Sequence, residues 1–195
     1  MTPACPLATV LYRFDDAARF PVMESHTTAQ GPVAVRTDRD DAGRFLRIAY
    51  QRQAADADEV TIVLALPLVA VDGRPRQLLL DVLGGSGVWG LQLEGMDGGG
   101  GPILFSFGVA EFEGWGTLRT EARQVATPVQ FHRLRLISAG SSASPDLGLR
   151  LLSVTGAVRL VPPGIARSAL DSPRLAPRDG LQSNHPPQAG AKCQG

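Results

Sequence analysis

Apolar and polar residues alternate in short runs along most of the chain. In Val88–Gly95, for example, Trp89, Leu91 and Leu93 are separated by glycine and polar residues. Successive side chains of a strand point to opposite faces of a sheet, so this alternation predicts strands with one buried face. No segment keeps apolar residues at helical spacing over three turns. The chain is therefore predicted to be almost entirely β.

Short alternating runs recur between clusters of Gly, Pro, Asp and Ser, the residues that favour turns. The predicted strands are Thr9–Phe14, Val33–Arg36, Arg44–Gln51, Glu59–Leu66, Gln77–Leu83, Val88–Gly95, Ile103–Gly108, Trp115–Ala122, Phe131–Ser138 and Gly156–Val161. The clearest predicted turns are TDRDDAG, QAADAD, VDGRPR, MDGGGG and SAGSSASPD. Short strands with turn signals every eight to twelve residues or so favour an antiparallel two-sheet β-sandwich over alternating βαβ units.

Glycine clusters flank the most regular of these strands, and GGSG at Gly84–Gly87 raises the question of a phosphate-binding loop. Such a loop needs its glycines to lead into a helix N-terminus, where free N–H groups face the anion. Here a predicted strand follows instead. The glycines are predicted to form tight turns.

The composition changes after Val161. Residues 162–195 are rich in Pro, Gly, Ser and Ala and contain no aromatic residue. Such a segment buries too little apolar surface to offset the entropy lost on ordering. We therefore expect a single β-sandwich domain over residues 7–161, followed by a disordered tail or linker over residues 162–195.

Charge and targeting features exclude several classes of partner. The 19 basic and 19 acidic residues cancel, so nothing directs the whole molecule toward nucleic acid or anionic lipid. The N-terminal residues lack the basic and apolar regions of a signal peptide, and no apolar run has the length of a membrane span. We expect a soluble chain, or one module of a larger exported protein.

Side-chain parity indicates which polar residues share a face. The residues of predicted strands that point away from the leucines of their own strands include Arg47, Gln92, Glu94, Arg133 and Arg135. One interpretation is a solvated outer face. The other is a ligand surface, because the planar groups of Arg, Gln and Glu hydrogen-bond several hydroxyls at fixed spacing. Trp115, in EFEGWGTLR, is either an anchor that packs inward or an exposed platform on which a ligand stacks.

Recognisable catalytic patterns are missing from the sequence. Ser86 does not fit the GxSxG nucleophile motif, because Val88 occupies the final glycine position. Glu111 and Glu113 flank a turn and are predicted to be solvated charges rather than a hydrolytic pair. The three histidines are too scattered for a zinc motif. We therefore expect no enzymatic activity.

The order of these features resembles the galactose-binding-like β-sandwich domains, similar to carbohydrate-binding modules, of bacterial carbohydrate-active proteins. The segments that carry the resemblance are LYRFDD, LLLDVLGGSG, WGLQLEGMDG, GWGTLR, PVQFHRLRLIS and GAVRLV, between Leu11 and Val161.

The resemblance implies a jelly-roll fold and a non-catalytic accessory module that binds a glycan or polysaccharide. It also implies a structural calcium held by acidic residues of the first and last strands. Asp15 and Asp16 match the first acidic element, whereas the last strand carries Arg159. Two alternatives remain open: a docking module that packs against a neighbouring enzyme domain, and a small jelly-roll hydrolase or lyase.

Overall fold

Nine strands and two 3₁₀ turns form the domain in the computed structural model, which describes residues 8–140 and 143–162. The strands are β1 (Thr9–Arg13), β2 (Val33–Asp40), β3 (Gly43–Tyr50), β4 (Glu59–Gly84), β5 (Val88–Met96), β6 (Pro102–Ala110), β7 (Gly114–Glu121), β8 (Val129–Ala139) and β9 (Asp146–Val161). The 3₁₀ turns are η1 (Ala17–Arg19) and η2 (Glu24–His26). None of the described helical segments is long or apolar enough to cross a membrane.

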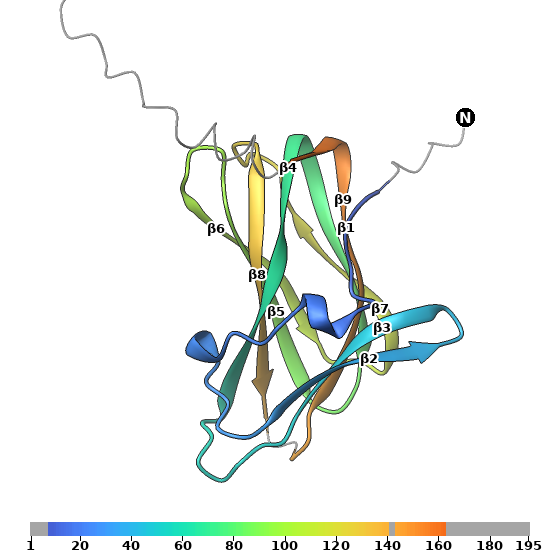
Figure 1. Cartoon of the computed structure of the whole chain (residues 1–195), viewed down its shortest axis with the longest axis vertical. Coiled ribbons are helices and arrows are strands. Elements are labelled where there is room, and N and C mark those ends of the chain that lie inside the picture. Colours follow the sequence, from blue (N-terminus) through green and yellow to red (C-terminus); the bar gives the residue numbers. More distant parts are fainter. Residues whose placement is uncertain (1–7, 141–142, 163–195) are drawn as a thin grey trace, which may run out of the picture.

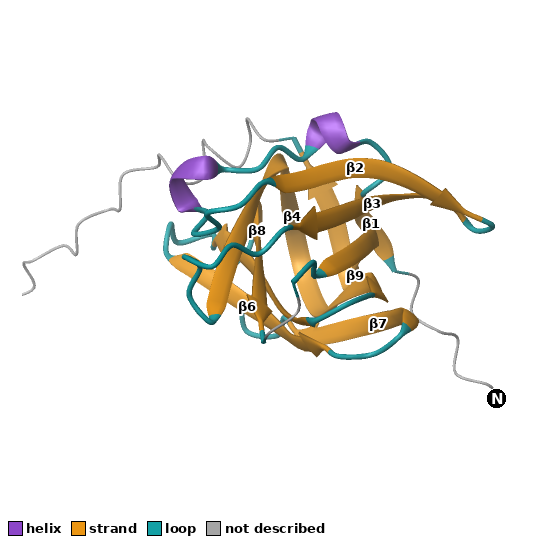
Figure 2. Cartoon of the chain, turned by 90° about the horizontal axis from the view of Figure 1, so that it is seen from below, coloured by secondary structure: helices purple, strands orange, loops and turns teal. Residues whose placement is uncertain are grey.

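The long strand β4 belongs to both layers of the fold (Figure 1). Its first part, Glu59–Ala65, pairs with β8, while its second part, Gln77–Gly84, pairs with β7 on one edge and β9 on the other. We call the sheet formed by β4, β8, β5 and β6 the first layer. The second layer contains β2, β3, β9, β4 and β7, with β1 beside β9. All pairings are antiparallel, which confirms the predicted jelly-roll β-sandwich (Figure 2).

One hydrophobic core lies between the two layers. Trp89, Leu91 and Leu93 of β5 are fully buried there, as the alternation predicts. The indole Nε1 of Trp89 donates a hydrogen bond to the backbone oxygen of Asp146 on β9, at 3.0 Å. Trp89 therefore both fills the core and ties the first layer to the second.

A β-bulge in β8 corrects part of the predicted face assignment. Glu94 pairs with Arg133 but the next residue, Gly95, pairs with Phe131, so His132 is an extra residue in its strand. An extra residue reverses the parity of everything beyond it. Uninterrupted alternation would place Phe131 on the outer face with Arg133, yet it is buried in the core.

Two predicted strand boundaries are also wrong. VDGRPR, predicted as a turn, lies inside β4, where Asp72 pairs with Arg159 and Arg74 with Ala157. Gly73 adopts a φ of +111° there, which lets the strand bend without a chain reversal. Strand β9 begins at Asp146 rather than Gly156. Its first part was not predicted because a bulge at Arg150 interrupts the alternation there. The predicted tail lies outside the described residues beyond residue 162.

Truncation of the buried indole tests the packing. Replacing Trp89 with Ala removes a fully buried side chain and its interlayer hydrogen bond, so the free energy of unfolding should fall by about 3–5 kcal/mol. Urea denaturation measures this loss. The control is Leu104→Ala, since Leu104 is 54% exposed and its truncation should cost less than about 0.5 kcal/mol. Similar losses for the two variants would contradict the assigned faces.

Candidate functional site

Four of the predicted ligand-binding residues meet on the outer face of the first layer. Glu94 of β5 lies between two arginines of β8: its carboxylate oxygens are 3.5 Å from Arg133 Nη1 and 3.5 Å from Arg135 Nη1. Gln92 stands directly opposite Arg135 in the ladder. We call this group the β5–β8 polar face. Its charged side chains are partly exposed, so their remaining donors and acceptors are accessible.

The backbone fixes the spacing of this polar face. Leu134 and Leu136 alternate with the two arginines and are fully buried, so β8 cannot rotate without removing them from the core. His132, at the bulge beside Arg133, is half-buried. Burial and the positive charge of Arg133 lower the pKa of His132, which keeps the imidazole neutral at pH 7. No Trp, Tyr or Phe occupies the outward positions of β8 and β5 beside these groups.

Arg47 lies apart from that face, on the outer side of the second layer. Its Nη1 contacts Asp146 Oδ2 at 2.6 Å and its Nε lies 3.2 Å from Asp38 Oδ2. Both carboxylates belong to neighbouring strands of the same layer. The structure therefore gives Arg47 two intramolecular partners and does not bring it together with the β5–β8 polar face.

The GGSG turn binds a carboxylate of the chain itself. Asp146 Oδ1 accepts hydrogen bonds from the Ser86 backbone N–H at 2.8 Å and from Ser86 Oγ at 3.0 Å. A Cβ at Gly85 would lie 2.4 Å from the same oxygen, so only glycine allows this approach. The turn prediction is correct, and the turn also positions Asp146 for Arg47.

Trp115 occupies a half-buried position on the second layer. The guanidinium carbon of Arg150 lies 3.7 Å from the centre of its ring, and Phe45 meets the ring edge-to-face at 5.3 Å. The indole Nε1 donates to Asp40 Oδ2 at 2.8 Å, and Arg150 forms an ion pair with the same carboxylate. The ring is therefore not part of the main core and is fixed by polar partners.

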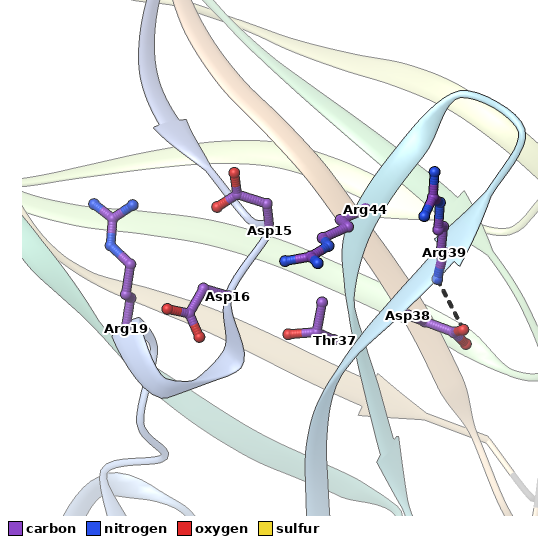
Figure 3. Close-up of a pocket in the computed structure, with 7 residues that line it drawn as sticks. All are labelled: Asp15, Asp16, Arg19, Thr37, Asp38, Arg39 and Arg44. Atoms are coloured by element: carbon purple, nitrogen blue, oxygen red, sulfur yellow. Dashed lines mark hydrogen bonds between the residues drawn. The ribbon is translucent and has the colours of Figure 1, made fainter.

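Three hollows follow one another along the second layer, and each shares lining residues with the next; we call them together the Arg150 groove. The first hollow, of about 210 Å³, is lined by Asp81, Trp115, Gly116, Thr117 and Arg150. The second, of about 310 Å³, shares Arg150 and adds Arg13, Asp15, Ala42, Gly43, Arg44 and Leu151. The third, of about 660 Å³, shares Asp15 and Arg44 and adds Asp16, Arg19, Thr37, Asp38 and Arg39 (Figure 3).

The residues at the calcium position do not fit a metal site. Asp16 caps η1, with its Oδ1 accepting from the Ala18 backbone N–H at 3.1 Å. Arg159, on the last strand, forms a two-point ion pair with Asp72 instead of supplying an acid. Within residues 8–140 and 143–162, no three Asp, Glu, His or Cys side chains gather closely enough to hold a metal ion. Asp15 and Asp16 belong to the Arg150 groove.

Comparison with known proteins adds the fold relationship. No protein-family model and no curated protein sequence matches the chain. The family 11 carbohydrate-binding module of cellulosomal cellulase Lic26A-Cel5E of Clostridium thermocellum matches with a TM-score of 0.53 and 10% sequence identity, over 79% of this chain and 97% of that one. This chain has the β-sandwich fold of a carbohydrate-binding module.

Two further matches show the settings in which this fold occurs. A family 11 carbohydrate-binding module from Clostridium thermocellum, in complex with a β-1,3-1,4-mixed-linked tetrasaccharide, has a TM-score of 0.53 and 11% identity, over 79% of this chain and 98% of that one. The enzymatically active domain of bacteriophage CBA120 tailspike protein 4 has a TM-score of 0.51 and 10% identity, over 76% of this chain and 20% of that one. The carbohydrate-binding-module fold thus also occurs as a small part of a much longer chain.

The sequence did not predict the roles of two residues of the second layer, Arg150 and Asp40. Arg150 lies in a run of leucines at a bulge, where alternation counted from the two sides gives opposite faces. Asp40 lies at the end of β2, in a stretch predicted as a turn. A pairing between Asp40 and Trp115 spans 75 residues and has no local sequence signal.

The carboxylate of Asp40 gives the Trp115 cluster a predictable pH dependence. Desolvation alone would raise the pKa of Asp40, but hydrogen bonds from Trp115, Ala42 and Arg150 outweigh it and hold the pKa below its ordinary value. The folded state therefore binds this proton less tightly than the unfolded state, in which the pKa of an Asp carboxyl is about 3.9. The stabilisation from Asp40 should be present above about pH 4 and be lost as the pH falls through the lowered pKa.

Chemical denaturation at several pH values checks this expectation. Asp40→Asn should be less stable than the wild type at pH 7, and the difference should shrink below about pH 4. A difference that stays constant down to pH 2.5 or so would contradict the assigned role of the carboxylate.

Proposed function

We propose that this protein is a non-catalytic glycan-binding module and that the β5–β8 polar face carries the contact. The observation behind this is the placement of Gln92, Glu94, Arg133 and Arg135, whose planar polar groups lie side by side on two paired strands. Arginine forks hold two acceptors at once, and carboxylate and amide oxygens accept from hydroxyls. Such a set matches the alternating donors and acceptors of a sugar ring.

Rigidity supports the same proposal. The buried leucines of β8 fix the backbone, and Glu94 restrains both guanidinium groups before any ligand arrives. Restraint in advance lowers the ordering cost of binding. The alternative is that these groups only solvate the sheet, since partly exposed ion pairs contribute about 0–1 kcal/mol each to stability.

The fold relationship is the second support. A module with the same fold is known in complex with a β-1,3-1,4-mixed-linked tetrasaccharide, which makes that tetrasaccharide a suitable first probe for this chain. The low identity means that side-chain contacts are argued from this chain alone.

A docking role is the second candidate, and strand β6 favours it. Leu104 and Val109 of this strand are each 54% exposed, so β6 offers apolar side chains to a neighbour. In the tailspike protein the matching region is only 20% of the chain. We propose that in this role a neighbouring enzyme domain would pack against β6. Because Leu104 stands directly opposite Glu94 in the ladder, such packing would also cover part of the β5–β8 polar face.

Removal of both arginines tests glycan binding. Arg133→Ala combined with Arg135→Ala should weaken binding of the mixed-linked tetrasaccharide, or of whichever glycan an array selects, by at least tenfold, about 1.4 kcal/mol. Isothermal titration calorimetry measures the affinity, and circular dichroism checks that the fold is intact.

The matched control removes the same charge elsewhere. Arg74→Ala with Arg123→Ala alters two exposed arginines away from the polar face and should leave the affinity unchanged. Equal losses of affinity in both double variants would show that net charge alone accounts for the effect. Unchanged binding in the Arg133/Arg135 variant would move the site elsewhere, and absence of binding by the wild type to every arrayed glycan would favour the docking role.

A further inference from the structure

The Arg150 groove exists because strand β9 changes partners along one edge. Leu147–Leu149 pair with β3, whereas Leu151–Val154 pair with β1. Arg150 lies at the change, and its backbone oxygen accepts from the Phe14 N–H at 3.0 Å just beyond the end of β1. The two partner strands follow one another along that edge, and the middle hollow lies where one succeeds the other, lined by Arg13 beside β9 and Arg44 of β3. The groove is thus built by the topology of the sheet.

Guanidinium groups without carboxylate partners gather in the third hollow. Arg39 of β2 stands directly opposite Arg44 of β3, and Arg19 of η1 lines the same space. Among the described residues, none of these three arginines forms an ion pair. Like charges directly opposite each other in a ladder destabilise it. This arrangement indicates that the hollow is suited to a negatively charged group from outside.

The acids of the third hollow have other roles. Asp38 contacts Arg47 at 3.2 Å, and Asp16 caps η1. Asp15 remains available, and Figure 3 shows it opposite Arg44, on the segment between β1 and η1. A carboxylate in that position accepts hydroxyl hydrogen bonds, as a sugar ring requires. The hollow therefore combines groups for an anion with an acceptor for hydroxyls.

The other end of the groove offers an apolar wall. Trp115 lines the first hollow together with Thr117 and Asp81, which hydrogen-bond to each other at 2.7 Å. Arg150 links this hollow to the middle one and is held by Asp40 and the indole ring. An aromatic wall with nearby polar groups suits the alternating C–H and hydroxyl surfaces of a sugar.

We propose that the Arg150 groove is a second binding site, which takes an oligosaccharide bearing a carboxylate, with the acidic sugar unit between Arg19, Arg39 and Arg44. The neighbouring units extend through the middle hollow toward Arg150. This site lies on the second layer and does not depend on the β5–β8 polar face, on which the proposed function rests.

The test compares two trisaccharides that differ only in their acidic groups. α-1,4-linked trigalacturonic acid is the probe, neutral α-1,4-linked galactotriose is the matched comparison, and inorganic phosphate represents a simple anion. Two-dimensional ¹H–¹⁵N NMR of the full chain locates each interaction by the amide signals that move. Trigalacturonic acid should shift signals of the groove, bind at least tenfold more tightly than galactotriose, and weaken as salt is raised.

Variants assign the effect to the groove. Arg39→Gln with Arg44→Gln should weaken trigalacturonic acid binding at least tenfold; both side chains are exposed, so the fold should be unaffected. Arg133→Ala with Arg135→Ala, and the control Arg74→Ala with Arg123→Ala, should leave this binding unchanged.

Each contrary result is distinct. Equal binding of galactotriose, or equal binding of phosphate at the same signals, would overturn the acidic-oligosaccharide proposal. Unchanged binding in the Arg39/Arg44 variant would overturn the assigned residues. Loss of trigalacturonic acid binding only in the Arg133/Arg135 variant would overturn the second site and leave the proposed function standing.

Discussion

The continuity of β4 through both layers is the constraint on which the remainder of the fold depends. Its first half buries Val60, Ile62 and Leu64 from one layer, and its second half buries Leu80 and Val82 from the other. Buried backbone groups must be hydrogen-bonded, so each half of this strand needs neighbours on its edges. β8 and the segment around Val22 flank the first half, while β7 and β9 flank the second. The positions of the other strands follow from these pairings.

The sequence predicted the fold wherever period-two alternation is uninterrupted. β5 is the clearest case, because no extra residue disturbs Trp89, Leu91 and Leu93. Prediction failed where a bulge adds one residue, as at His132 and Arg150, because each side chain beyond that point changes face. Bulges arise from the partner strand as much as from the local sequence. A glycine within an extended strand, such as Gly73, equally gives the local signal of a turn.

The candidate site was partly predictable for the same reason. Parity within β5 and β8 placed Glu94 outward together with Arg133 and Arg135, and the pairing of these two strands brings them into contact. Alternation within a strand does not indicate which layer that strand joins. Arg47 was therefore grouped with residues that lie on the outer face of the other layer. The partners of Trp115 depend on pairing between distant strands and on the bulge at Arg150. These contacts are determined by the tertiary structure and have no local sequence signal.

A formal net charge of zero conceals an uneven distribution of ion pairs. Asp146 is held by the GGSG turn and Arg47, and Asp40 by Trp115 and Arg150. Those carboxylates stabilise the second layer, and the glycines that suggest a phosphate loop serve this internal anion. Two other sets of arginines are less fully matched. Two share the single carboxylate of Glu94, and Arg39 and Arg44 stand opposite each other with neither forming an ion pair among the described residues. Incomplete neutralisation on a rigid sheet leaves hydrogen-bond donors at fixed positions, which is the physical requirement for recognising a polar ligand from solution.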